Sequence, residues 1–279
     1  MTTSIRHGRE KDKRDNATKK RDTKTSKALS NILRHQALKL GLKVRSDGFV
    51  KLKDLLGMKP DKRFDFSHTS LADVQRVVKD SDKQRFKLQL EGHEWFIRAN
   101  QGHTISCIDE EELLRRVRCP SEVPVCIHGT YWKAWQLIKA SGLSKMKRNH
   151  IHFAVGLPDS DGVISGMRGN VELIISINTE KAMKDGISFF LSDNGVILSS
   201  GIDGTIPPKY FLEVVKVSSG EVIFRGKDED GSTSPSIQTT QEKQEASPSA
   251  NGSPSVSSQD TNCTDTPCKS DARAPTTTQ

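Results

Sequence analysis

The sequence predicts an α+β fold built from two lobes and flanked by two disordered ends. The segment before residue 120 is basic and rich in helix patterns, the segment after it is rich in strand patterns, and both ends hold few apolar side chains. Prolines at 120 and 124 mark the boundary between the lobes, because proline disfavours the helical conformation in the residue before it. We therefore expect an arm over residues 1–24, lobes over residues 25–119 and 120–217, and a tail over residues 218–279.

The charge of the 279-residue chain is unevenly distributed. The formal net charge is +8, but residues 226–279 carry four basic and eight acidic side chains, which leaves the rest of the chain at about +12. A field of this sign favours a polyanionic partner such as RNA. The five cysteines form no CxxC pair, the first residues lack an apolar signal stretch, and the longest apolar runs are too short to cross a membrane. We expect a reduced, cytoplasmic or nuclear protein without a membrane partner.

The arm, residues 1–24, alternates basic and acidic side chains and is almost without apolar ones. Such a segment buries too little apolar surface to offset its conformational entropy, so we expect it to be disordered. Its cations leave three interpretations open: a solvated tail, salt-sensitive contacts to RNA phosphates, or a nuclear address. They are Lys19, Lys20, Arg21 and Lys24.

The first lobe begins with an amphipathic helix over Ser26–Leu40. Its apolar residues recur at steps of three and four, which places them on one stripe; they are Leu29, Ile32, Leu33, Ala37 and Leu40. Arg34 and His35 fall outside this stripe, on the two edges of the polar face. On the pattern alone they are either a solvated basic pair or two ligand-binding side chains.

The rest of the first lobe predicts further helices and a hairpin. Gly41 is placed to cap the first helix, and Ser46-Asp47-Gly48 predicts a turn before a short helix over Leu52–Leu56. Ser70 and Asp73 form a capping-box pattern for a helix through Val78. Two alternating runs then flank a Glu91-Gly92 turn, which predicts a hairpin over Phe86–Leu90 and Glu94–Arg98, and Asp109–Val117 predicts one more helix. Three helices followed by a hairpin, in a basic segment of this length, predict a winged-helix-like lobe.

The second lobe predicts many short strands and two helices, a pattern typical of an α+β domain. The helices are expected near Trp132–Ala140 and Thr179–Lys184. The strands are expected at Val125–His128, Ile151–Val155, Val171–Ile177, Ile187–Leu191, Val196–Ser199 and Phe211–Val217. From about Ser218 onward Ser, Thr, Pro and Gln replace apolar residues, which predicts a disordered tail.

Four polar features are candidates for chemistry. Arg85 lies at the start of the hairpin, and Arg168 lies in a glycine-rich loop over residues 162–169, which is either an anion site or a loop with one surface cation. His128-Gly129-Thr130 ends a strand, and alternation sends His150 and His152 to one face of another. These two histidines could bind a metal, but no third ligand has suitable spacing, so we expect no metal. The glycine spacing fits neither a P-loop nor a Rossmann fingerprint.

The same residues resemble a known family. The runs LSNILRHQALKLGL, DGFVKLKDLL, DKQRF, IRANQGHTI, HGT, NHIHFAVG, VISGMRG, DGISFFLSDNGVIL and PPKYF are similar to those of the NAD-dependent tRNA 2′-phosphotransferases, in unbroken order over residues 25–217. The resemblance implies an RNA-binding winged-helix lobe and an ADP-ribosyltransferase-like lobe that holds NAD. It implies four catalytic side chains, Arg34, His35, Arg85 and Arg168, and five cofactor-binding residues, His128, Gly129, Thr130, His152 and Val196. Glutamate usually occupies the position of Val196 in enzymes that modify proteins, so valine there argues against protein ADP-ribosylation.

The reaction that the resemblance implies has two steps. The 2′-phosphate of tRNA or RNA attacks the NAD ribose carbon that bears nicotinamide; the 2″-hydroxyl then attacks the phosphorus, releasing 2′-hydroxyl RNA and ADP-ribose 1″,2″-cyclic phosphate. Arginine suits such a site because its planar fork holds phosphate oxygens bidentately and stays charged. His35 is a candidate to protonate the departing oxygen or to hold the phosphate. We expect a monomer that needs 2′-phosphorylated RNA and NAD but no metal.

Two rival functions remain open on the sequence. The first is an ADP-ribosyltransferase that caps terminal phosphates of RNA or DNA, which would need the same arginines and NAD pocket. The second is an RNA-binding module without catalysis, which the joint presence of the four catalytic side chains argues against.

Overall fold

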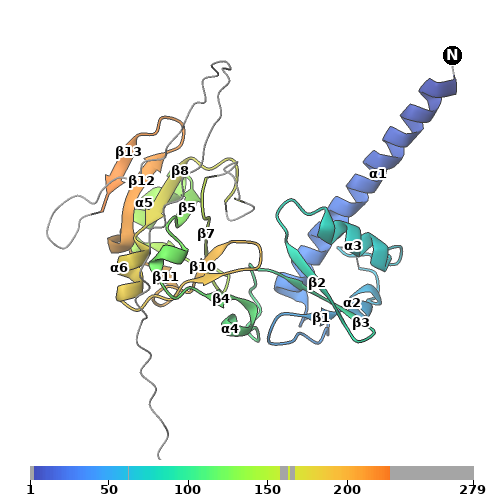
Figure 1. The fold of residues 1–279 in the computed structure, drawn as a ribbon, viewed down its shortest axis with the longest axis horizontal. Coiled ribbons are helices and arrows are strands. Elements are labelled where there is room, and N and C mark those ends of the chain that lie inside the picture. Colours follow the sequence, from blue (N-terminus) through green and yellow to red (C-terminus); the bar gives the residue numbers. More distant parts are fainter. Residues whose placement is uncertain (1–2, 62, 158–162, 164–166, 227–279) are drawn as a thin grey trace, which may run out of the picture. The chain divides into compact units, whose positions relative to one another are not determined.

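The computed structural model describes residues 3–61, 63–157, 163 and 167–226, and it confirms a mixed α+β fold (Figure 1). By their contacts, all described residues belong to one unit. Among the described residues, no helix combines the length and the apolarity that a membrane crossing needs.

The helices largely follow the local sequence signals. They are α1 (Thr3–Asn31), α2 (Leu52–Leu56), α3 (Leu71–Lys79), α4 (Glu110–Leu113), α5 (Trp132–Ser141) and α6 (Thr179–Lys184). The predicted capping box of α3 is confirmed: the Ser70 hydroxyl accepts from the Asp73 backbone N–H at 3.2 Å, and the Ser70 N–H donates to the Asp73 carboxylate at 2.9 Å. These bonds satisfy backbone groups that a helix start leaves without partners.

The strands form four small sheets, and every pair of strands in them is antiparallel. The first sheet has the order β1-β3-β2, from Val50–Lys51, Glu94–Ala99 and Phe86–Glu91. The second has the order β4-β9-β10-β7, from Arg115–Arg116, Phe190–Leu191, Ile197–Ser199 and Ile151–Phe153. The third pairs β11 (Thr205–Ile206) with β6 (Leu143–Ser144), and the fourth has the order β13-β12-β8-β5, from Val222–Arg225, Phe211–Lys216, Leu173–Ile177 and Ile127–Thr130. The predicted hairpin is therefore confirmed as β2–β3.

The predicted apolar stripe of the first lobe is confirmed. Leu29, Ile32, Leu33 and Ala37 are buried in a hydrophobic cluster with residues of α2, α3 and the first sheet, and Leu40 packs against it. Burial of this stripe, worth roughly 1.5–3 kcal/mol for each large side chain, holds the end of α1 against the sheet.

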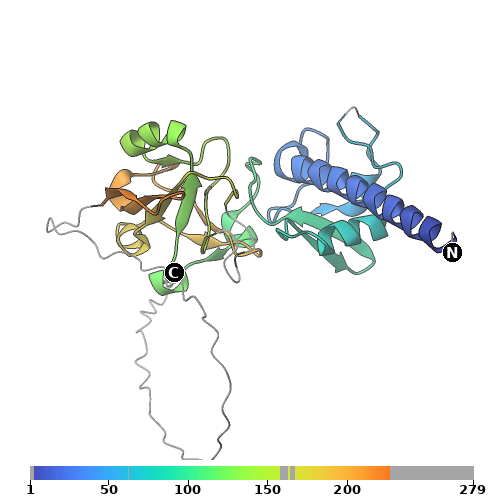
Figure 2. The same cartoon turned by 90° about the horizontal axis from the view of Figure 1, so that it is seen from above.

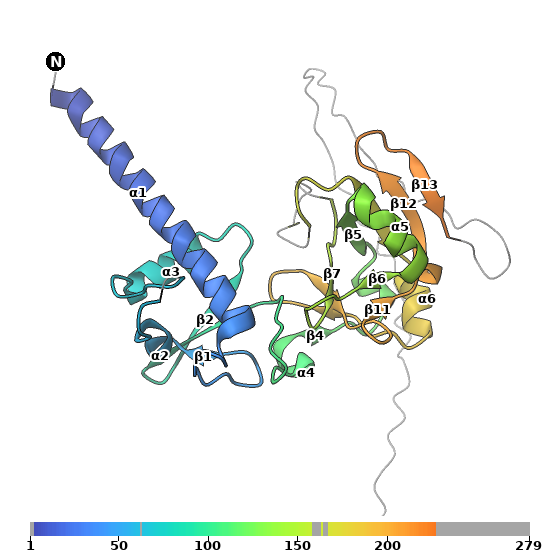
Figure 3. The ribbon, with the colours of Figure 1, turned by 180° about the vertical axis from the view of Figure 1, so that it is seen from behind.

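The expectation of a disordered arm is wrong for residues 3–24, which form one continuous helix with residues 25–31. The physical reason lies in contacts distant in sequence: Arg76 of α3 donates two 2.8 Å bonds to the Asp22 carboxylate, and Arg21 pairs with Asp73 at 2.9 Å. Figures 2 and 3 show α1 alongside α3, with its N-terminal part extending beyond that helix. The ion pairs anchor the arm, and the segment before them, in which arginine and lysine are frequent, continues the helix.

Two further expectations are corrected. The helix predicted over Asp109–Val117 ends at Leu113, because Arg115 and Arg116 form strand β4 and pair with Leu191 and Phe190. The tail predicted from residue 218 begins later, because Val222–Arg225 pairs with β12 as strand β13. The rest of the expected tail, residues 227–279, lies outside the described residues.

Strand β10 contributes to two hydrophobic clusters. Leu198 and the preceding Val196 pack into the cluster of the first lobe, whereas Ile197 packs into a second cluster formed by residues 117–214. Alternation along an extended strand sends neighbouring side chains to opposite faces, so one strand serves both clusters. All three side chains are at most 1% exposed.

Candidate active site

Arg34 and His35 lie in a short π-helical segment, Ile32–Gln36, that follows α1. The Ile32 carbonyl accepts from the Ala37 N–H at 2.8 Å, five residues on, in place of the usual four. The Arg34 carbonyl accepts instead from the Thr104 N–H at 2.9 Å, and the Thr104 hydroxyl lies 3.1 Å from Nδ1 of His35. The loop after β3 therefore fixes the backbone of Arg34 and the ring of His35.

Gly102 in that loop lets the Arg34 side chain lie against the backbone. Its φ of +88° belongs to the left-handed region, and an added Cβ would lie 3.5 Å from Nε of Arg34. A side chain at this position would be strained and would crowd the guanidinium.

A groove of about 740 Å³, here called the α1 groove, brings three of the predicted catalytic residues together. The groove is lined by eight side chains of α1 and its π-helical continuation, from Lys19 to Arg34. His35 lines it as well. Residues 80–82, Val77 and Arg85 complete the wall. The Arg85 guanidinium lies 3.0 Å from Asp82 and 3.2 Å from the Ser81 hydroxyl, so it faces the groove in an exposed ion pair.

Two buried asparagines hold the segment that carries Arg85. Asn100 donates to the Gln84 carbonyl at 2.7 Å, and Asn194, in the β9–β10 turn, donates to the Lys83 carbonyl at 2.9 Å. Gln84 has φ +40°, an uncommon conformation for a residue other than glycine, so these bonds offset local strain. The position of Arg85 thus depends on residues from both lobes.

A second cavity of about 350 Å³, here called the arginine cavity, brings most of the predicted cofactor residues to Arg34 and Arg168. The predicted residues in its wall are Arg34, His128, Gly129, Thr130, His152 and Arg168. Gln101, Tyr131, Arg148 and Met167 complete the wall, although none of them was predicted as a site residue. None of these described lining residues is acidic. Arg34 lines both the α1 groove and the arginine cavity, whereas His35 and Arg85 line only the groove.

The charges in the arginine cavity repel one another. Burial first, and then the charges of Arg148 and Arg85, lower the pKa of Arg34 from its ordinary value to about 10. Burial and the charge of Arg168 lower the pKa of Arg148. Among the described residues, neither Arg34 nor Arg148 has a carboxylate partner. Cations held together without counter-charges create a positive potential that favours an anion in this cavity.

The two histidines of the arginine cavity are neutral at neutral pH. Burial is the main cause that lowers the pKa of His152 to about 3, and burial also lowers the pKa of His128. His128 Nδ1 lies 2.8 Å from the His152 carbonyl, and His152 Nε2 lies 2.7 Å from the Gln101 amide oxygen. These contacts fix both rings, so they can act as oriented hydrogen-bonding groups. His150 was expected on the same face, but it contacts the Phe190 ring and is not part of the cavity wall.

The wall of the arginine cavity leaves no room for a side chain at Gly129. An added Cβ would lie 2.5 Å from Cγ of Met167 and 2.7 Å from Val171. Of the glycine-rich loop predicted over residues 162–169, only residues 163 and 167–169 are described. Among the described residues, no three His, Cys, Asp or Glu side chains gather as a metal site requires.

Val196 is the one predicted cofactor residue that the structure does not bring to the others. It is fully buried in the cluster of the first lobe, and the arginine cavity does not include it. The sequence pattern around Val196 predicted strand β10 correctly. Which hydrophobic cluster the Val196 side chain enters, however, depends on the packing on each face of that strand.

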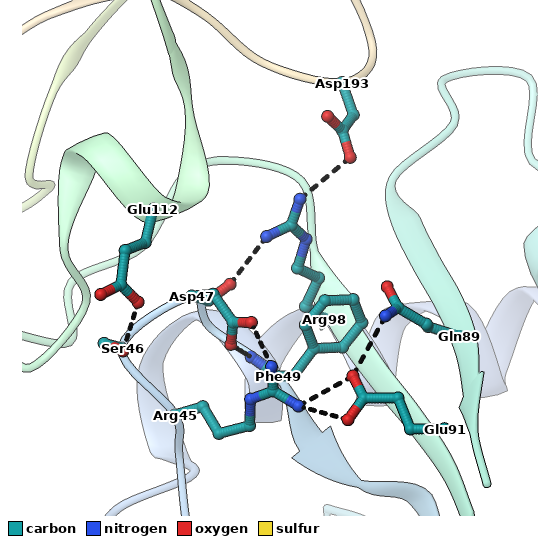
Figure 4. Close-up of polar contacts among 9 residues, drawn as sticks. All are labelled: Arg45, Ser46, Asp47, Phe49, Gln89, Glu91, Arg98, Glu112 and Asp193. Atoms are coloured by element: carbon teal, nitrogen blue, oxygen red, sulfur yellow. Dashed lines mark hydrogen bonds and ion pairs between the residues drawn. The ribbon is translucent and has the colours of Figure 1, made fainter.

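The β9–β10 turn also pairs with the first lobe through charge. Figure 4 shows the Arg98 guanidinium between the Asp193 carboxylate and the Asp47 carbonyl, at 3.0 and 2.9 Å, above the Phe49 ring. Lys87 also pairs with Asp193, at 3.0 Å. Arg98 is only 5% exposed, whereas the Asp193 side chain is 40% exposed, so the pair joins a buried guanidinium to a carboxylate that solvent reaches.

Comparison with known proteins agrees with this geometry. The family described as RNA 2′-phosphotransferase, Tpt1 / KptA family, matches residues 20–201. The tRNA 2′-phosphotransferase 1 of Homo sapiens is 47% identical over 200 residues, which cover 71% of this chain and 77% of the human protein. That of Danio rerio is 46% identical over 196 residues, covering 68% and 84%, and the tRNA 2′-phosphotransferase of Saccharomyces cerevisiae is 39% identical over 189 residues, covering 66% and 80%. The chain belongs to the RNA 2′-phosphotransferase family.

Proposed function

We propose that this protein removes the splice-junction 2′-phosphate of tRNA and transfers it to NAD, giving 2′-hydroxyl RNA, ADP-ribose 1″,2″-cyclic phosphate and nicotinamide. The observation that carries the proposal is the position of Arg34, which lines both the α1 groove and the arginine cavity. A phosphate bound by Arg34 is therefore in reach of His35 and Arg85 from one side and of Arg168 from the other. The printed names of the relatives, tRNA 2′-phosphotransferases, support the same RNA substrate.

The two lobes have separate tasks in this proposal. The first lobe, with α1, α3 and the β2–β3 hairpin, is a winged-helix-like module for RNA. The second is an ADP-ribosyltransferase-like module, in which β5 presents His128, Gly129 and Thr130 and β7 presents His152. Both assignments rest on element order and on the resemblance described above.

The arginine cavity suits NAD by its donor set. The guanidinium group of Arg148 can hold a pyrophosphate oxygen, and Thr130 and Tyr131 offer hydroxyls at the same wall. Gly129 removes the side chain that would otherwise crowd this wall. The volume of about 350 Å³ falls within the usual range for small-molecule sites. When bound, NAD supplies a ribose carbon with a good leaving group, nicotinamide.

The residues of the chain then orient charge and move one proton. In the first step, Arg34 and Arg168 hold the RNA 2′-phosphate oxygens for attack on the ribose carbon, with displacement of nicotinamide. In the second step, the ribose 2″-hydroxyl would lose its proton to solvent and its oxygen would bond to phosphorus as the RNA 2′-oxygen departs, while the arginines stabilise charge on the phosphoryl oxygens. His35 donates the proton that this oxygen needs. Burial, Arg34 and Arg148 lower the pKa of His35 in the free protein, and a bound phosphate dianion would raise it again.

The test uses an oligonucleotide with one internal 2′-phosphate, incubated with NAD, beside the same oligonucleotide without that phosphate. Loss of the phosphate with appearance of the cyclic phosphate and nicotinamide supports the proposal. A stable ADP-ribosylated RNA would instead favour a capping enzyme, and no nicotinamide release would favour a non-catalytic RNA-binding module. If His35→Ala releases the RNA 2′-hydroxyl at the wild-type rate in a single turnover, the role of His35 as proton donor is wrong.

A further inference from the structure

We infer that the α1 groove binds the RNA strand that flanks the 2′-phosphate, and that Lys19 and Lys27 contact its backbone phosphates. This inference rests on the proposed function and extends it from the reacting phosphate to the neighbouring nucleotides. The starting observation is that the groove continues from Arg34, His35 and Arg85 along a helix that was expected to be disordered.

The groove follows one face of the helix. The lining positions are three and four residues apart, as one side of a helix requires. They are positions 19, 22, 23, 26, 27, 30, 31 and 34. From Lys19 to Arg34 the helix rises by about 22 Å. At about 3.4 Å per stacked nucleotide, this length accommodates roughly six nucleotides. An internal 2′-phosphate has strand on both sides, so a site that admits it needs such a track.

The charged groups on this face favour phosphate. Lys19 and Lys27 are exposed, and neither has a carboxylate partner among the described residues. The acidic Asp22 in the same wall already accepts two bonds from Arg76, and Asp82 pairs with Arg85. The two lysines are therefore the cations of the helix face that remain available to a polyanion.

The remaining side chains of the face indicate the mode of recognition. Ser26, Ser30 and Asn31 offer hydroxyl and amide groups, which bond to phosphate oxygens and to ribose hydroxyls. No aromatic side chain is among the described residues that line the groove, so bases have no ring to stack on. We therefore infer backbone contacts that tolerate different RNA sequences.

The experiment compares two substrates of different length and two matched variants of the full chain. The substrates are a dinucleotide and a decanucleotide, each with one 2′-phosphate. The test variant is Lys19→Ala/Lys27→Ala, and the control is Lys20→Ala/Lys24→Ala, which removes the same charge from exposed positions of the same helix outside the groove. We measure KM for each substrate, kcat, and the dependence of kcat/KM on salt.

The inference predicts a roughly 5- to 30-fold rise in KM for the decanucleotide in the test variant, from two lost phosphate contacts. KM for the dinucleotide and both kcat values should stay at the wild-type level. The slope of log(kcat/KM) against log(salt) should become shallower by about 1.4, since each single-strand phosphate contact contributes about 0.7.

Three outcomes would overturn the inference: equal effects of the two double variants, an equal rise in KM for both substrates, or a faster reaction of the test variant. The last would mean that an acidic segment, such as the tail with its net charge of −4, occupies the groove in place of RNA. Failure of the wild-type protein to dephosphorylate either substrate would instead contradict the proposed function.

Discussion

Replacement of Arg148 by alanine should lower kcat/KM for the phosphotransfer by about 10- to 150-fold. Arg148 lines the arginine cavity with Arg34 and Arg168 and has no carboxylate partner among the described residues. A charge-assisted hydrogen bond to a phosphate oxygen contributes roughly 1.5–3 kcal/mol, and each 1.36 kcal/mol is a factor of ten in rate. Removal of that bond gives the stated range.

The same substitution should raise the pKa of His35. Burial is the largest cause that lowers this pKa, followed by the charges of Arg34 and Arg148, so loss of one cation relieves part of the shift. The pH at which the single-turnover release of RNA 2′-hydroxyl falls to half should therefore move upward. Arg148→Lys separates the two effects, because it keeps the charge and loses the planar fork. It should lose rate without this shift in pH.

The assay measures kcat/KM and the pH profile for Arg148→Ala, Arg148→Lys and the control Lys147→Ala. Lys147 is an exposed neighbour outside the cavity wall, and its replacement makes the same change in net charge. If Arg148→Ala matches Lys147→Ala within twofold in rate and pH profile, the assignment of Arg148 to the anion site is refuted.

Three other predictions concern the residues around this site. Asp82→Asn frees Arg85 from an exposed ion pair, so KM for phosphorylated RNA should fall by up to about fivefold, whereas Asp80→Asn in the same wall should leave KM unchanged. Asn194→Ala leaves the Lys83 carbonyl without its donor, so chemical denaturation should show a loss of about 1–3 kcal/mol, and kcat should fall because Arg85 is displaced. The pKa values of His103 and His152 are both lowered to about 3, chiefly by burial, whereas the unfolded chain takes up protons near pH 6.5. The stability that these two neutral histidines contribute is therefore fully present above that pH and is lost as the pH falls toward 3. From pH 7.5 to 5.5 they should lower the free energy of unfolding by about 3 kcal/mol, and a flat profile in urea titrations would contradict this.

The elements that sequence patterns predicted well are those with local causes. The capping box at Ser70 and the turn at Glu91-Gly92 each lie within a few residues of the element that they determine, and α6 has the bounds expected from its pattern. The burial of the stripe at Leu29, Ile32 and Leu33 followed from helical periodicity alone.

The features that sequence patterns missed depend on distant partners. Residues 3–24 are helical where Asp22 meets Arg76, and Arg115 is in a strand because it pairs with Leu191. The π-helical turn at Ile32–Gln36 is accompanied by contacts to Thr104, about seventy residues away in the chain. Local propensity does not include such contacts. It therefore predicted a disordered arm, a helix that continues to Val117, and an ordinary α-helix through Ile32–Gln36.

The candidate site shows the same division. The resemblance named Arg34, Arg168 and His152 as site residues, and all three line the arginine cavity. Arg148 had no local signal beyond its place four residues before His152, because a cation in a basic turn looks like a solvated one. Val196 was assigned by its order along the chain, and only the packing of the finished fold reveals which cluster its side chain enters.

The double use of strand β10 has a consequence for synthesis on the ribosome. The first cluster is built mainly from residues 29–114, but Phe190, Val196 and Leu198 also belong to it. The N-terminal lobe therefore cannot complete its core when its own segment leaves the exit tunnel; it must wait until residue 198 has emerged. During that interval an incomplete apolar surface is exposed, which is the condition under which nascent chains associate or engage chaperones. Shortening the chain before β10 should therefore yield an aggregation-prone product rather than a free RNA-binding lobe.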